Sequence, residues 1–159
     1  VRLSLRGQYV FGARLIPQAE EVLGGMFSVR GYPESAVAGD DVLIASVEYR
    51  LNLPRAFPFS EDVGELFGGP FRWVPQEPYG EADWSLVLKA FLDAGLAGIN
   101  DPLFFEEEAE LLGAGVGLEL GFRTNVSLRL DWGFAIEPLE RRGVESGDDR
   151  VHFSATILF

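Results

Sequence analysis

The stretch "FSVRGYPESAVAGDDVLIASVEYR", residues 27–50, decides how the chain is interpreted, because a turn-rich polar loop becomes a strand within it. From residue 42 to residue 52, apolar and polar side chains alternate with a period of two, the pattern of a strand with two different faces. One face carries Leu43, Ala45, Val47, Tyr49 and Leu51, and the other carries Ile44, Ser46, Glu48 and Arg50. The stretch therefore predicts a loop with the sequence Val29-Arg30-Gly31-Tyr32 that leads into an amphipathic β-strand.

The same alternation recurs in five other segments, which predicts six strands near 1–12, 42–52, 84–96, 113–123, 125–136 and 151–159. No charged residue falls on the apolar positions of these segments. Their lengths, about 9–12 residues, are close to the ~9–11 residues that a tilted membrane-spanning strand needs. Alternation alone does not tell which face is covered, since a soluble sandwich buries its apolar face and a membrane barrel turns that face to lipid.

The distribution of aromatic residues favours lipid. If the last strand runs towards the lower side, one group of rings falls at the lower rim and a second group falls towards the upper rim. The lower group is Tyr49, Trp84, Phe122 and Phe159, and the upper group is Tyr9, Phe11, Trp132, Phe134 and Phe153. Two aromatic belts are typical of the two membrane interfaces. We therefore expect an all-β, antiparallel transmembrane β-barrel, and a soluble β-sandwich is the alternative.

Composition restricts the possible functions. The chain has 159 residues, enough for one domain, and 13 basic against 25 acidic residues give a net charge of -12. This charge argues against a nucleic-acid partner, because no basic stripe is present to neutralise phosphates. The absence of cysteine excludes disulfides and thiolate metal sites. The chain begins without methionine and alternates at once, so we expect it to be the tail of a longer protein.

The connections are uneven in length. The polar loops 97–112 and 137–150 are expected on the outer side of a membrane, whereas the link between the fourth and fifth strands is very short. The exception is 53–83, a proline-rich and partly apolar excursion of about 30 residues, a length that is uncommon for a loop without structure of its own. We expect it to be an ordered excursion on the periplasmic side, with a short helix at 60–67.

Three groups of residues carry a resemblance to a known family. They are Val29-Arg30-Gly31-Tyr32 followed by Gly39-Asp40 and "ASVEYR", then Phe91-Leu92-Asp93-Ala94-Gly95, and finally an amphipathic strand that ends in Phe159. In this order they resemble the C-terminal part of the outer-membrane superfamily of BamA-type assembly factors and of the TpsB transporters of two-partner secretion. The sequence of the loop, VRGYPESAVAGD, is more similar to the TpsB branch.

The resemblance implies that residues 1–159 are the last six strands of one sixteen-stranded barrel domain, with upstream strands and periplasmic domains missing. It also implies that the long loop at 13–41 folds into the lumen, where Arg30 meets Asp93. The alternation of the third strand agrees with this contact, since Asp93 and Phe91 both lie on its polar face. Gly31, Tyr32 and Gly95 complete this expected lock, in which glycine permits close approach and an aromatic ring can stack on the guanidinium.

Two further groups of residues are expected to act in transport and assembly. The charges on the polar faces predict a cross-strand ladder or a polar track for an extended polypeptide, formed by Glu48, Arg50, Lys89, Glu119, Arg123, Arg129 and Asp131. The resemblance implies that the end of the last strand is read by the outer-membrane assembly machinery, through Phe153, Ile157 and Phe159.

The sequence predicts no enzyme, no catalytic residue, no cofactor and no metal site. His152 is the single histidine and no Gly-x-Ser-x-Gly motif accompanies it, so a hydrolase is disfavoured. The acidic clusters at 40–41, 106–108 and 148–149 lack EF-hand spacing and are interpreted as solvated loops. The expected function is transport of unfolded polypeptide across the cell outer membrane, with the secreted or nascent polypeptide, the lipid bilayer and the assembly machinery as partners. The alternatives are a BamA-like assembly factor and a soluble β-barrel that binds an apolar ligand.

Overall fold

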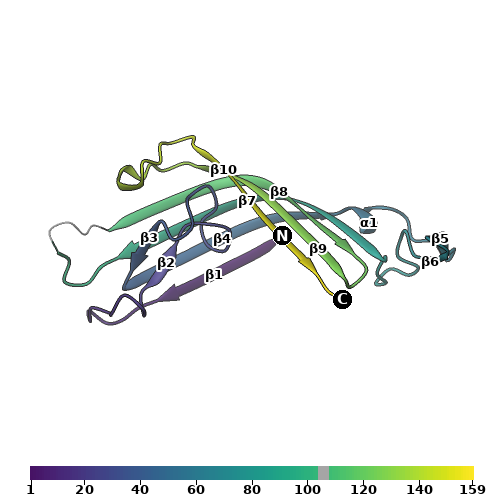
Figure 1. Cartoon of the computed structure of the whole chain (residues 1–159), viewed down its shortest axis with the longest axis horizontal. Helices are drawn as coiled ribbons and strands as arrows, with labels where there is room; N and C mark the ends of the chain where they lie inside the picture. Colours follow the sequence, from purple (N-terminus) through teal and green to yellow (C-terminus); the bar gives the residue numbers. More distant parts are fainter. Residues whose placement is uncertain (104–107) are drawn as a thin grey trace. The chain divides into compact units, whose positions relative to one another are not determined.

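The computed structural model describes residues 1–103 and 108–159, and its main element is one six-stranded antiparallel sheet (Figure 1). The strands are β1 (Arg2–Gln8), β4 (Asp41–Asn52), β7 (Trp84–Gly98), β8 (Ala109–Phe122), β9 (Val126–Ala135) and β10 (Asp149–Ile157). They follow one another in the sheet in the order β1-β4-β7-β8-β9-β10, and the sheet is not closed into a barrel. All six predicted strands are therefore confirmed, and closure is not observed.

Several strand boundaries differ from those predicted. β8 begins at Ala109 rather than at residue 113, and β7 ends at Gly98 rather than at residue 96. β1 ends at Gln8 rather than at residue 12, because the chain turns at Phe11 and Gly12, which both have positive φ, and Ala13 N–H bonds the carbonyl of Val10. β10 begins at Asp149 and ends at Ile157, two residues before the predicted limits.

The register of β1 on β4 preserves the alternation of both strands. Leu3 lies opposite Val47, and Leu5 lies opposite Ala45. A slip by one residue would move every side chain of β1 to the other face. The observed register therefore keeps the apolar residues of the two strands together.

The apolar face of the strands is the exposed one. In β4 and β7, Leu43, Leu92 and Leu96 are 45–47% exposed, while the side chains between them on the opposite face, such as Glu48 and Asp93, are buried. The covered face of the sheet therefore carries the buried charges together with apolar core residues such as Ile44, and the mainly apolar face is left uncovered, whereas in a soluble protein the apolar face of a sheet is usually covered.

The chain divides into two compact units, and β4, β7, β8, β9 and β10 each contribute residues to both. The first unit is Val1–Tyr49, Ala90–Val116 and Asp131–His152, and the second is Arg50–Lys89, Gly117–Leu130 and Phe153–Phe159.

The first unit contains the hydrophobic core. Here β2 (Glu21–Leu23) pairs with β3 (Val37–Gly39), and the short 3-10 helix η1 spans Glu140–Arg142. The loop between β2 and β3 supplies buried Val29 and Tyr32, which join sheet residues such as Ile44, Ala97 and Leu111 in one cluster. The loop with Arg30 is thus folded onto the charged face of the sheet, the face on which the resemblance implies it.

The second unit contains the excursion 53–83. The helix predicted at 60–67 is wrong. The chain instead forms α1 (Leu53–Ala56) and a small hairpin of β5 (Gly64–Leu66) and β6 (Gly69–Phe71) (Figure 1). Pro54 lies at the start of α1, where its fixed φ suits the first turn. Neither helix in the described part of the chain is long and apolar enough to cross a membrane.

Candidate functional site

Arg30 lies in the loop between β2 and β3 and is buried, with only 3% of its surface exposed. The pairing of Glu21–Leu23 with Val37–Gly39 brings the two ends of this loop together. Gly31 follows with a φ of 99°, and a Cβ at this position would lie 2.6 Å from the backbone of Phe134. Only glycine combines that backbone conformation with so close an approach to β9.

The guanidinium of Arg30 forms a fork with the carboxylate of Asp93 in β7. Its Nε donates to Oδ2 at 2.6 Å and its Nη2 donates to Oδ1 at 2.8 Å, while the backbone N–H of Arg30 also reaches Oδ2 at 3.2 Å. Asp93 is fully buried. The predicted contact between Arg30 and Asp93 is confirmed, and two parallel charge-assisted hydrogen bonds give it a fixed geometry.

Two further carboxylates face the same guanidinium. Nη1 of Arg30 lies 2.7 Å from Glu48 Oε1 in β4 and 3.4 Å from Asp131 Oδ2 in β9. Ser46 adds a hydroxyl that donates to Asp93 Oδ1 at 2.6 Å. The arginine therefore ties one loop to three strands. We call these residues the arginine cluster: Arg30, Ser46, Glu48, Phe91, Asp93 and Asp131.

An aromatic ring completes the arginine cluster. The guanidinium carbon of Arg30 lies 3.5 Å from the ring centroid of Phe91, as in a cation–π contact. Burial alone would lower the pKa of Arg30, but its hydrogen bonds and charge interactions with Asp93, Glu48 and Asp131 outweigh burial and raise it. Arg30 is therefore a permanent cation that neutralises part of a buried acidic cluster.

Tyr32 has a different role from that of Phe91. Its hydroxyl donates to the carbonyl of Glu137 at 2.6 Å and accepts from the N–H of Leu112 at 3.1 Å. The ring is fully buried, and burial raises the pKa of its hydroxyl. Tyr32 thus fastens the loop to β8 and to the segment after β9, rather than stacking on Arg30.

Glycines on the sheet make room for the loop. A Cβ at Gly133 would lie 2.7 Å from Gly31 N, and one at Gly95 would lie 2.7 Å from Val29 Cγ2. A Cβ at Gly113 would collide with the carbonyl oxygen of Arg30. Sequence reasoning named Gly95 but missed Gly113 and Gly133. Both glycines lie on the charged face of their strands, and this position is the sequence feature that could have identified them.

The remaining charges of the predicted track form a separate group in the second unit. Glu119 of β8 accepts from Arg50 Nη2 at 2.5 Å and from Lys89 Nζ at 2.8 Å, and Arg129 Nε lies 4.0 Å away. Glu48 and Asp131, which were predicted to belong to the same ladder, lie in the arginine cluster instead. Arg123 follows β8 with positive φ, and its backbone N–H bonds the carbonyl of Asp83.

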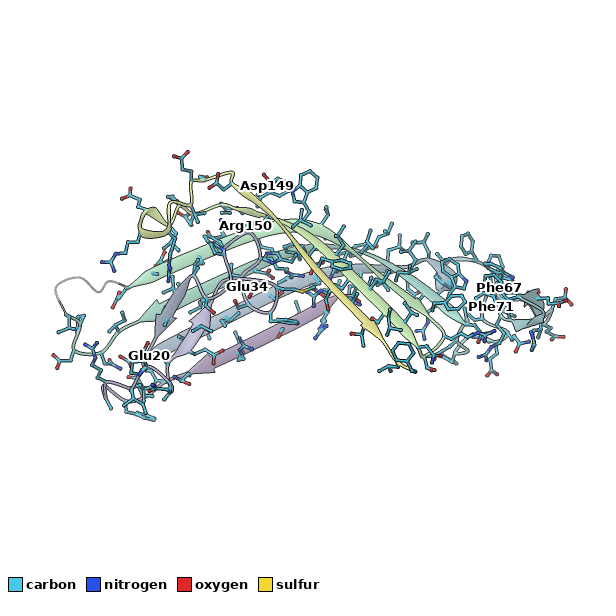
Figure 2. All side chains as sticks on the ribbon, viewed as in Figure 1. Glu20, Glu34, Phe67, Phe71, Asp149 and Arg150 are labelled. Carbon is cyan, nitrogen blue, oxygen red and sulfur yellow. The ribbon has the colours of Figure 1, made fainter. Side chains whose placement is uncertain are left out.

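The other candidate residues belong to neither group, and among them His152 interacts electrostatically with Arg30 and Asp131 of the arginine cluster. Phe153, Ile157 and Phe159 are exposed. His152 is largely buried, with Nδ1 3.5 Å from Glu34 Oε1, and lines a hollow that Glu34, Asp149 and Arg150 also border. Figure 2 labels these last three residues. The carboxylates of Asp40 and Asp41 accept backbone N–H bonds from Leu15, Asn100 and Val10. Asp40 is buried, so the interpretation of 40–41 as a solvated loop is wrong, because its carboxylate is used to hold neighbouring backbone. The acidic residues 106 and 107 lie outside the described residues.

Comparison with models of known protein families, with curated proteins and with solved structures finds no match to this chain.

Proposed function

We propose that the chain is the C-terminal portion of an outer-membrane β-barrel that moves unfolded polypeptide across the membrane, as in two-partner secretion. The observation that carries the proposal is the reversed polarity of the sheet. Leu43, Val47, Leu92 and Leu96 are exposed, while Lys89, Asp93 and Asp131 are buried on the opposite side. In water such an arrangement is unfavourable, because it exposes apolar area and buries charge. In a bilayer the exposed face meets hydrocarbon.

The arginine cluster supports the same proposal. A loop held by one cation to three strands is placed at a fixed depth on the polar face, which in a closed barrel is the lumenal face. The motif residues of the resemblance, Arg30 and Asp93, are the ones that meet at 2.6 Å. The proposal includes the strands and periplasmic domains that the family has upstream, since the open edges β1 and β10 would leave unpaired backbone groups in lipid.

Membrane insertion is tested in the full-length protein by attaching an environment-sensitive fluorophore to a single cysteine, and residues 1–159 contain no cysteine of their own. We expect a probe at position 151, on the exposed face of β10, to be quenched by spin-labelled lipid in phosphatidylcholine vesicles. A probe at position 152 is the matched control, because the His152 side chain is largely buried on the opposite face. A clean monomer in detergent-free buffer, with no lipid quenching at 151, would overturn the proposal and favour the soluble binding module.

Polypeptide transport is tested by photo-crosslinking in the full-length protein. The photoreactive amino acid p-benzoylphenylalanine replaces Arg129 or its neighbour Leu130, which point to opposite faces of β9. A translocating polypeptide should crosslink at 129 and not at 130. Crosslinks of nascent outer-membrane proteins, rather than of a secreted chain, would favour the BamA-like alternative.

A further inference from the structure

The excursion 53–83 presents aromatic rings that the proposed transport does not use. Phe67 is 93% exposed at the tip of the β5–β6 hairpin (Figure 2). Phe57, Phe59 and Tyr79 of the same segment are also exposed. Single exposed apolar residues are common on protein surfaces, so exposure alone does not indicate a partner, and the way in which the hairpin holds Phe67 is decisive.

The base of the hairpin is firmly attached to the end of the sheet in the second unit. The ring of Phe71 is buried and stacks on Phe122 of β8, with centroids 5.5 Å apart. Trp84 of β7 donates its indole N–H to the carbonyl of Trp73 at 2.9 Å. Arg72 and Asp83 add a two-point ion pair, with Arg72 Nη2 2.7 Å from Asp83 Oδ1. The excursion is therefore an ordered support and not a loose linker.

The attachment also identifies the side of the sheet to which the hairpin belongs. Trp84 shares its parity with exposed Leu88 in β7, and Phe122 shares its parity with exposed Val116 in β8. Both anchoring rings therefore belong to the apolar face of their strands, Trp84 at the start of β7 and Phe122 at the end of β8. The hairpin continues the exposed apolar face and not the charged face.

The tip is held in a conformation that a phenylalanine rarely adopts. Phe67 and Gly68 connect β5 to β6, and both have positive φ, 52° and 75°, as a two-residue type I′ turn requires. Asparagine and glycine are favoured in such turns, and an aromatic residue is disfavoured. A ring that is exposed, strained and supported by an ordered base indicates a function at the tip.

We propose that the β5–β6 hairpin is a membrane-interface anchor, and that Phe67 inserts among the headgroups of the phospholipid bilayer in which the strands lie. The inference rests on the proposed membrane location of the sheet. Aromatic rings favour this layer of a bilayer, and the rings of Trp84 and Phe122 already belong to it in the proposed barrel. The exposed acidic residues Glu61, Asp62 and Glu65 favour zwitterionic over anionic lipid, because like charges repel.

The experiment places a fluorophore on a cysteine at position 65, next to the tip, in the full chain reconstituted in phosphatidylcholine vesicles. Phe67 is either kept or changed by Phe67→Asn, which suits the positive φ and so preserves the turn. The matched control is Phe11→Asn, because Phe11 is similarly exposed and also has a φ of 52°. Spin labels near the lipid headgroups should quench the probe at least about twofold more with Phe67 than with Phe67→Asn. The Phe11→Asn control should leave quenching unchanged.

A probe at position 151 distinguishes failure of the anchor from failure of the proposed function. Lipid quenching at 151 without quenching at 65, or quenching at 65 that ignores Phe67→Asn, overturns the anchor and leaves the membrane proposal intact. Quenching at neither position overturns both. Phe67-dependent quenching at 65 alone supports a lipid contact and overturns the spanning sheet. Emission at 65 that changes only with protein concentration identifies a second copy as the partner and overturns the lipid anchor.

Discussion

Removing Asp93 or Arg30 should destabilise the first unit unequally. At a charge separation of about 4 Å and an effective dielectric of about 20, each carboxylate attracts the guanidinium by ~4 kcal/mol before desolvation is counted. Breaking a buried pair costs ~3–5 kcal/mol. Asp93→Ala leaves Arg30 with Glu48 and Asp131, so we expect the free energy of unfolding to fall by about 3 kcal/mol. Arg30→Ala leaves three buried carboxylates that have lost their shared cation, so we expect the free energy of unfolding to fall by about 5 kcal/mol.

The double variant discriminates between a shared interaction and two independent ones. Once Arg30 is absent, Asp93→Ala removes a carboxylate that repels Glu48 and Asp131. The double variant should therefore be no less stable than Arg30→Ala alone, with a coupling free energy of about 3 kcal/mol. Arg30→Lys should fall between wild type and Arg30→Ala, because lysine keeps the charge but cannot form the fork with Asp93.

The assay is urea unfolding of the lipid-reconstituted chain, followed by the fluorescence of Trp132, which lies in the same unit as the arginine cluster. Trp73→Phe and Trp84→Phe remove the other two indoles. Arg55→Ala is the control, since Arg55 is 58% exposed and 3.8 Å from Glu81, and should change stability by less than ~0.5 kcal/mol. Additive losses in the double variant would refute the reasoning, as would equal losses from Arg55→Ala and Arg30→Ala.

Three other substitutions or conditions give direct tests. Gly133→Ala should push the loop off the sheet, at a cost of ~1–3 kcal/mol, and trypsin should then cleave after Arg30, which is protected while the loop is in place. Glu119→Ala should lower the free energy of unfolding by ~1–3 kcal/mol in urea, since it removes the carboxylate that Arg50 and Lys89 share, whereas an unchanged midpoint would show that this carboxylate does not contribute to stability. The hydrogen bond from Arg72 lowers the pKa of Asp83. The stabilisation by this pair should therefore be complete above the ordinary carboxyl pKa and should be lost as the pH falls through the lowered value. Hydrogen exchange of the Arg72 amide, which donates to Asp83, should show this loss, and Asp83→Asn should abolish the pH dependence.

The strands and the pairing of Arg30 with Asp93 could be predicted from the sequence, because a period of two assigns each side chain to a face and the motifs name the partners. Phe91 was also expected beside Arg30, and the structure places its ring there. Ser46, Glu48 and Asp131 could not be assigned to the arginine cluster from the sequence. Parity placed Glu48 and Asp131 on the charged face, but only the register between strands decides which charges meet. For this reason the predicted ladder separates into the arginine cluster and the group around Glu119.

The excursion was misjudged for a tertiary reason. The stretch 60–67 was expected to be helical, yet Gly64–Leu66 pairs with Gly69–Phe71 around a turn that places a phenylalanine at positive φ. The packing of Phe71 on Phe122, 51 positions later in the chain, fixes this arrangement. No local pattern in 53–83 contains that contact.

The separation along the chain between Arg30 and its partners has a consequence for the order in which the protein assembles. Asp93 and Asp131 follow Arg30 by 63 and 101 residues. During synthesis the arginine therefore emerges long before the carboxylates that will surround it, and it remains hydrated until β7 and β9 have paired through β8. Contacts so distant in sequence form late, because closing a long segment of chain is entropically costly. Docking of the loop onto the sheet is thus a late event in folding, and it requires that the strands beneath the loop are already in register.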